Sequence, residues 1–469
     1  MKTRDQDAPH EYPGAWWPAG EPDKQKIGRL KIEPDGQATL VLDAVHQRAA
    51  FQALVTNAQQ ENESIRAVIF HGHDKNGEPF TLFGCVRTNT HTAVVYSIET
   101  FSVAMVVKGR HYGSYAEIKF DQVYLDFAYM HEWLEGRGVQ LKQEENDKIV
   151  LDKPSGEERI STTGRGYAVV RQSSLESGFD AEGVRLSSRE RLSCRFDEPW
   201  SLDRVHELII DLQWLMSLAV GLPVPVTGLT GLSNDWQITI GDKKLSKPMD
   251  FFIHWPGWDT RHRNPYRWDM LFTVSAFSDG LGPALARWRD YRQKHHAVLS
   301  CYFSTIFNRH LYANHEFLFL AHALELYHQI HFDGSYQSAA DFKTRIDKIA
   351  AIVPDKDEAI WLRERLAGAN HKTLADRLRE LITAKKSLLG DLVPDPERFV
   401  LRVKDTRNYY THYDEGLRRN GRVAEDADLY EITQAMRALL EVCFLQDLGI
   451  SPAVISKVTK PRGTYVKFF

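Results

Sequence analysis

The sequence predicts an α+β protein in which a β-rich N-terminal domain is followed by an all-α C-terminal domain. Residues 26–170 alternate apolar and polar side chains in short runs, which is the pattern of half-buried strands. From Gly280 onward the chain is almost wholly helical in pattern, beginning with one run over 281–307. We assign 1–300 to the first domain and 301–469 to the second, because a chain of this length exceeds one ordinary core.

Turn residues separate the strand-like runs of the N-terminal domain. Pro34-Asp35-Gly36 and Lys75-Asn76-Gly77 lie between apolar runs, and their glycines can adopt positive φ without a Cβ clash. Strand-like segments return at 224–226, 237–240 and 250–254. We therefore expect an antiparallel sandwich or an open barrel.

One helix is expected inside this β-rich domain, between residues 201 and 221. Ser201 is its expected N-cap. Its apolar residues recur at spacings of three and four: Leu202, Val205, Leu208, Ile209, Leu212, Leu215 and Met216.

Composition and the lack of known motifs exclude several classes of protein. The four cysteines are far apart and form no Cys-x-x-Cys pair, so neither a zinc ribbon nor a disulfide framework is indicated: Cys85, Cys194, Cys301 and Cys443. No apolar signal core and no stretch of roughly 20 apolar residues is present, so we expect a cytoplasmic protein without a membrane segment. The motifs of nucleotide hydrolysis, hydride transfer, serine hydrolysis and zinc proteolysis are also lacking, and no cofactor or metal is expected.

The segment that carries chemistry is Val403-Lys-Asp-Thr-Arg-Asn-Tyr-Tyr-Thr-His-Tyr-Asp-Glu-Gly416. RNA is cut by its own 2′-hydroxyl when a group of near-neutral pKa moves the proton and a fixed cation stabilises the phosphorane. His412 and Arg407 can supply these functions. Residues five apart on an ideal helix differ by about 140°, so the helix ends near Thr411 or a second copy completes the site. We expect Gly416 to be the helix stop.

A structural interpretation of the same residues stays open. His412 can interact with the helix dipole, and Arg407 can pair with Asp405 or Glu415. Tyr409, Tyr410 and Tyr413 are candidate partners for stacked bases, although core packing is preferred for Tyr410. The net charge of −4 requires a local basic patch for RNA, and basic residues do flank the motif: Arg402, Lys404, Arg418, Arg419 and Arg422.

The chain resembles the Apea-like HEPN proteins, bacterial anti-phage nucleases that couple a β-rich N-terminal domain to a helical HEPN domain. The resemblance rests on Gly14-Ala-Trp-Trp-Pro18 with the hairpin around Gly36, on Phe319-Leu-Ala-His-Ala-Leu-Glu-Leu-Tyr-His328, and on Arg407-Asn-Tyr-Tyr-Thr-His412. It implies an HEPN helical bundle and a metal-independent endoribonuclease. His412 would be the acid/base, Arg407 would bind the phosphate, and Asn408 would assist.

The resemblance also implies an abortive-infection defence in which the N-terminal domain restrains the nuclease until a phage-encoded trigger arrives. We expect single-stranded RNA as substrate and a homodimer or a dimer of dimers. Supporting roles fall to Glu325, Tyr409 and Asp405, and RNA binding to Arg402, Lys404, Arg418 and Arg419. The alternative is a non-catalytic HEPN module that dimerises and binds nucleic acid.

Two further features have competing interpretations. Glu325-Leu-Tyr-His328 has the Glu-x-x-His spacing of di-iron bundles, but the chain has no second copy, so Glu325 either bonds His322 or orients Arg407 from a neighbouring helix. The loop from Trp255 to Trp268 combines aromatic and basic residues, which fits either contact with a nucleic acid or protein trigger, or internal arginine-aromatic stacking.

Overall fold

The computed structural model describes residues 8–45, 68–92, 96–136, 140–144, 148–152, 160–180, 183–255, 266–308, 310–390 and 392–458. The chain divides into two compact units, 1–286 and 287–469, which we describe separately. Helix α4 (Leu281–Lys294) runs across this division. The domain boundary after residue 300 stays a prediction, and helix α5 (His296–Phe307) continues through it.

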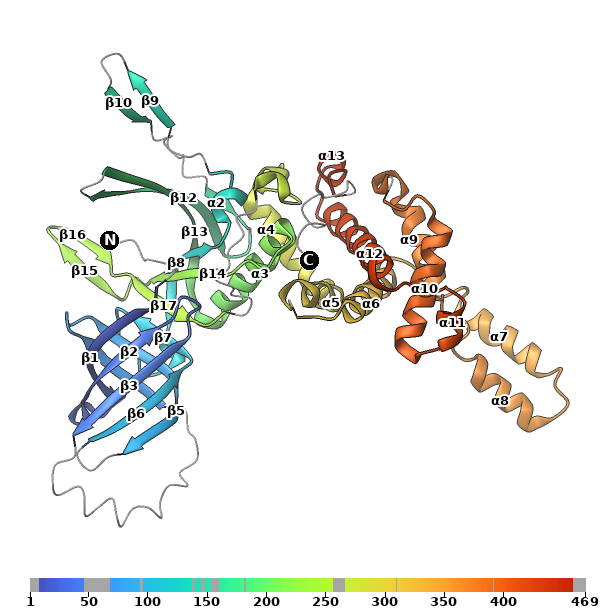
Figure 1. The fold of residues 1–469 in the computed structure, drawn as a ribbon, viewed down its shortest axis with the longest axis horizontal. Helices are drawn as coiled ribbons and strands as arrows, with labels where there is room; N and C mark the ends of the chain where they lie inside the picture. The colour runs from blue at the N-terminus through green and yellow to red at the C-terminus, as the bar shows by residue number, and fades with distance from the viewer. Residues whose placement is uncertain are drawn as a thin grey trace, which may run out of the picture. The chain divides into compact units, whose positions relative to one another are not determined.

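The first unit contains a closed barrel of six antiparallel strands (Figure 1). The strands follow one another around the barrel as β5-β4-β1-β2-β3-β6, and pairing of β5 with β6 closes it. Alternate side chains such as Leu30, Ile32, Leu40 and Leu42 are buried inside with Trp16, which confirms the two-residue period. The bounds are β1 His10–Pro18, β2 Lys26–Ile32, β3 Ala38–Val45, β4 Val68–Asp74, β5 Pro79–Thr92 and β6 Tyr96–Val103.

Strand β5 also connects the barrel to a second run of antiparallel strands. Its first part, from Phe80 to Phe83, pairs with β7, and its later part, from Val86, pairs with β6. Between them Gly84 has φ +64°, and a Cβ there would lie 2.8 Å from the Cβ of Ala104. The remaining strands are β7 Met105–Lys108, β17 Met249–Ile253, β14 Val226–Leu232, β8 Lys119–Phe127, β13 Gly183–Ser201, β12 Tyr167–Asp180 and β11 Ile160–Thr162.

The expected helix inside the β-rich unit is α3 (Leu202–Val220), which packs on β8 and β13. Ser201 occupies the N-cap position but its hydroxyl makes no capping hydrogen bond, and Gly221 ends the helix with φ 75°. The two expected hairpin turns join β2 to β3 and β4 to β5. Smaller elements are α2 Met130–Trp133 and the hairpin strands β9 Gln140–Glu144, β10 Lys148–Asp152, β15 Gln237–Ile240 and β16 Lys243–Ser246.

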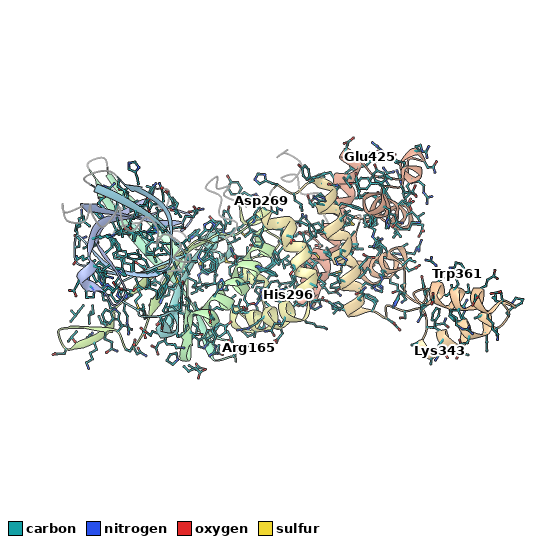
Figure 2. All side chains as sticks on the ribbon, turned by 90° about the horizontal axis from the view of Figure 1, so that it is seen from below. Arg165, Asp269, His296, Lys343, Trp361 and Glu425 are labelled. Carbon is teal, nitrogen blue, oxygen red and sulfur yellow. The ribbon has the colours of Figure 1, made fainter. Side chains whose placement is uncertain are left out.

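The second unit is helical, as the sequence predicts. The expected single run over 281–307 is wrong in one respect: it breaks at His295, whose backbone (φ −108°, ψ 23°) separates α4 from α5. Helices α7 and α8 form a hairpin that carries Lys343 and Trp361 (Figure 2). The other bounds are α6 Ala313–His331, α7 Ala339–Ala350, α8 Lys356–Leu366, α9 Leu374–Leu389, α10 Pro396–His412, α11 Glu415–Arg419, α12 Asp426–Asp447 and α13 Pro452–Ile455.

Helix α6 is the centre of this bundle because it packs against α5, α9, α10 and α12. Its buried face contains Phe317, Leu320, Leu324 and Tyr327, which recur at helical spacing. Among the described helices of the whole chain, none combines the length and the apolar character needed to cross a bilayer.

Candidate functional site: the end of helix α10

Helix α10 carries the predicted reactive residues at its C-terminal end. It begins after Asp395, whose carboxylate accepts a hydrogen bond from the backbone N–H of Arg398. It ends at His412 because Tyr413 adopts the left-handed conformation, with φ 52° and ψ 45°. The expectation that Gly416 stops the helix is wrong. Gly416 lies inside α11, and its backbone N–H donates a hydrogen bond to the carboxylate of Asp414, which is the N-cap residue of that helix.

Arg407 is held on the side of α10 that faces α6. Its Nη2 lies 3.7 Å from Oε2 of Glu325, and its Nη1 donates a 3.3 Å hydrogen bond to Oδ1 of Asn408. The guanidinium side chain keeps 35% of its surface exposed, whereas Glu325 keeps 19%. Arg407 is thus restrained by two neighbours and still open to a ligand.

His412 occupies the last helical position and is exposed. Within the part of the chain that the structure describes, its imidazole makes no hydrogen bond or ion pair with another side chain. On an ideal helix the five-residue spacing turns the side chains of Arg407 and His412 about 140° apart. We therefore expect one chain to present the guanidinium and the imidazole on different sides of α10.

Asp405 is a buried anchor for this helix. Its carboxylate is 4% exposed and lies 2.7 Å from Nε of Arg422 and 3.2 Å from Nζ of Lys404. Next to it the fully buried hydroxyl of Thr406 accepts a 2.9 Å hydrogen bond from the backbone N–H of Ala424. These contacts fix the C-terminal half of α10 against the segment that leads into α12.

The three tyrosines of the motif have different environments. Tyr409 is buried and its ring packs edge-on against Tyr410 and Tyr413. Tyr410 is half-buried near Phe317, and burial raises the pKa of its phenol. Tyr413 is 63% exposed, so it is the tyrosine of the three that is open to a stacked base.

The basic residues around the motif are largely neutralised by carboxylates. Arg402 pairs with Asp428, Lys404 with Asp405, and Arg418 with Glu425 at 2.9 Å. Figure 2 marks Glu425 just before α12. Arg419 contacts the backbone carbonyl of Glu415 instead, and among the described residues it has no carboxylate partner.

The Glu-x-x-His pair on α6 does not converge on a common point. Glu325 faces Arg407 and lies 3.9 Å from the exposed His322, whereas the buried His328 bonds Glu380 of α9 at 2.7 Å. Glu380 also accepts from Lys372, and this ammonium is the main cause of the lowered pKa of that carboxyl. The di-iron interpretation is therefore unsupported by the geometry of this pair, and the pairing of His328 with α9 was not visible in the sequence.

Two family models match the chain. One, described as Apea-like HEPN, matches residues 318–453, so the helical unit is an HEPN domain. The other, described as ApeA N-terminal domain 1, matches residues 11–288, which is more than half of the chain. The chain belongs to the ApeA family. Neither the curated proteins nor the solved structures contain a significant match.

The candidate trigger-binding loop between Trp255 and Trp268 lies mostly outside the described residues, which omit 256–265. Of its ends, Tyr266 stacks on Trp268 with ring centroids 4.5 Å apart, and both rings are exposed.

Proposed function

We propose that the helical unit is an endoribonuclease that cuts single-stranded RNA without a catalytic metal. The observation that carries the proposal is the pairing, on one helix of an HEPN domain, of a restrained but open Arg407 with an exposed His412 at the helix end. HEPN domains typically dimerise, bind RNA and act as ribonucleases, which supports the same assignment.

The chemistry follows from the two side chains. His412 takes the proton of the 2′-hydroxyl as that oxygen attacks the adjacent phosphorus, and a second proton transfer accompanies loss of the 5′-oxygen. Arg407 stabilises the charge that builds on the phosphorane oxygens, with Asn408 as an auxiliary hydrogen-bonding group. The products are a 2′,3′-cyclic phosphate, or its opened form, and a 5′-hydroxyl.

A second copy of the chain completes the proposed site. Because Arg407 and His412 face different sides of α10, one copy cannot direct both at one phosphate while the helix stays straight. Two α10 helices that meet across a two-fold axis can supply Arg407 from one copy and His412 from the other. We therefore propose a homodimer or a dimer of dimers as the active form.

The proposed biological role is anti-phage defence of the abortive-infection type, acting in the cytoplasm. The ApeA family match supports a defence role. The β-rich unit is the proposed regulatory part, which restrains the nuclease until a phage-encoded protein binds.

The decisive experiment incubates the full-length chain and cellular RNA, with its trigger if one is required, in the presence and absence of EDTA. Wild-type chain should cut in both conditions, and Arg407→Ala and His412→Ala should each cut at least 100-fold more slowly. His315→Ala, an exposed histidine at the start of α6, is the matched control and should cut normally. Variants that cut like wild type would refute the assignment, and RNA binding without cleavage by wild type would favour the non-catalytic module.

A further inference from the structure

Three potential metal ligands meet at one end of the helical bundle, although they are far apart in the sequence. His295 lies at the break between α4 and α5, directly before the His296 labelled in Figure 2; His331 ends α6, and Asp447 ends α12. One ligand atom from each lies within 4.8 Å of the others. The two Nε2 atoms are 2.8 Å apart, and Nε2 of His331 is 3.4 Å from Oδ2 of Asp447.

Neighbouring groups hold two of these three ligands, His295 and Asp447, in place. Nδ1 of His295 lies 2.9 Å from the carbonyl oxygen of Tyr291 and must donate to it, which leaves the lone pair on Nε2 directed into the cluster. Oδ2 of Asp447 accepts hydrogen bonds from the hydroxyls of Tyr291 at 3.1 Å and Tyr327 at 2.9 Å. Such outer contacts to ligating histidines and carboxylates are typical of zinc sites.

We propose that His295, His331 and Asp447 bind one zinc ion, with a fourth position for water. Donors about 2.0–2.2 Å from a tetrahedral zinc lie roughly 3.3–3.5 Å from one another. The 3.4 Å separation of His331 and Asp447 fits this spacing, and the two imidazoles need to move apart by about half an ångström. His295 is 2% exposed, so its ring is held inside the bundle where the three ligand atoms meet.

The ligand types and the charges around the cluster indicate which kind of metal ion would bind. Asp447 contributes the negative charge, whereas Lys294 and Lys385 oppose the binding of a cation. A hard cation such as Mg²⁺ or Ca²⁺ prefers several oxygen ligands, which the cluster does not offer. Two imidazoles and one carboxylate are a ligand set that zinc prefers.

The ion would join α5, α6 and α12 at one end of the bundle and leave the Arg407 region separate. His331 lies six residues beyond Glu325 on α6, which is roughly 9 Å along the helix axis. The proposed zinc site is therefore distinct from the proposed nuclease site. The competing interpretation is a hydrogen bond from Nε2–H of His331 to Nε2 of His295, with no metal.

The test uses the full-length chain without a histidine tag, stripped with EDTA, dialysed, and titrated with ZnCl₂. Bound metal is counted by mass spectrometry, and thermal melting is followed in parallel. Wild type should bind one zinc per chain and melt a few degrees higher when loaded. His331→Gln and Asp447→Asn should bind zinc at least tenfold more weakly and show no zinc-dependent shift, whereas the matched control His315→Gln should behave like wild type.

Cobalt provides a readout that does not depend on any variant folding. Co²⁺ in place of zinc on the wild-type chain should give the visible absorption of a tetrahedral nitrogen and oxygen site. Absence of both stoichiometric zinc and this absorption, or equal zinc binding by wild type, His331→Gln and Asp447→Asn, would overturn the proposal. Arg407→Ala should still bind zinc, so a failed nuclease assignment and a failed metal site give different results.

Discussion

Nη2 of Arg407 lies 3.7 Å from Oε2 of Glu325, and this contact links α10 to the central helix α6. The carboxylate is mostly buried, so its position is set by packing rather than by solvent. A guanidinium held by such a carboxylate has fewer orientations available before a phosphate binds. We therefore expect Glu325 to act as a positioning residue in the proposed site.

Replacing this carboxylate should slow cleavage without unfolding the protein. We expect Glu325→Gln to lower kcat by about tenfold, equivalent to about 1.4 kcal/mol in the barrier, with a smaller change in KM. Initial rates on a labelled single-stranded RNA measure both constants. Glu364→Gln, an exposed site on α8 with the same charge change, is the control; equal rates for Glu325→Gln and wild type would exclude the positioning role.

Because Asp405 is buried, removing its partner Arg422 should destabilise the protein more than removing Arg419. Arg422→Ala removes the 2.7 Å partner of a carboxylate that is 4% exposed and leaves Lys404 as its remaining ion-pair partner among the described residues. We expect a loss of about 2 kcal/mol in the free energy of unfolding. Arg419→Ala should change it by no more than about 0.5 kcal/mol. Urea denaturation compares them, and similar midpoints for both variants would contradict this account.

His328 should make the protein less stable in mild acid. Burial lowers the pKa of this imidazole, and Arg377 and Lys372 act in the same direction, while Glu380 opposes them. In the unfolded chain the pKa of this histidine is about 6.5, so the unfolded chain binds the proton more readily than the folded one. The contribution of His328 to the free energy of unfolding is therefore fully present above about pH 6.5, and it is lost as the pH falls toward the lower pKa of the folded state.

The measurement is the melting temperature of wild type and His328→Gln between pH 7.5 and 5. Wild type should lose more stability over this range than the variant, in which this titration is missing. Glu380 titrates below the range because its pKa is also lowered, chiefly by Lys372. Parallel curves of melting temperature against pH for the two proteins would show that the titration of His328 does not affect stability.

Arg419 should contribute more to RNA affinity than its paired neighbour Arg418. Arg418 must first release Glu425 before it can contact a phosphate, whereas Arg419 has only a backbone contact among the described residues. In a His412→Ala background, which prevents cleavage, Arg419→Ala should reduce the slope of log K against log salt concentration by about 0.7. Fluorescence anisotropy with a labelled single-stranded RNA measures the slope. A larger reduction in Arg418→Ala would reverse the assignment.

Local patterns predicted the elements of the fold well. The two-residue period, the hairpin turns at Gly36 and Gly77, and the inserted helix α3 all follow from nearby residues, and each is present in the structure. The closure of the barrel could not be predicted, because it requires β1 to pair with β4 and β3 to pair with β6, and these strands are far apart in the sequence. Long-range pairing leaves no periodic signal within a single strand.

The candidate site was predictable in its residues and less so in its geometry. The spacing of Arg407 and His412 predicts different sides of one helix, but the sequence favours Gly416 as the helix end, whereas Tyr413 forms it in the structure. Glycine is the usual left-handed residue, so a tyrosine in that conformation gives no sequence signal. The His295–His331–Asp447 cluster was missed because its members come from three separate helix ends.

The strand β5 has a mechanical consequence for the N-terminal unit. It contributes backbone hydrogen bonds both to the closed barrel and, through β7, to the sheet that supports α3. No flexible tether separates these two parts along β5, so the barrel cannot swing away without tearing a ladder of hydrogen bonds. A ligand that distorted the barrel would therefore also deform the sheet beneath α3, because β5 belongs to both.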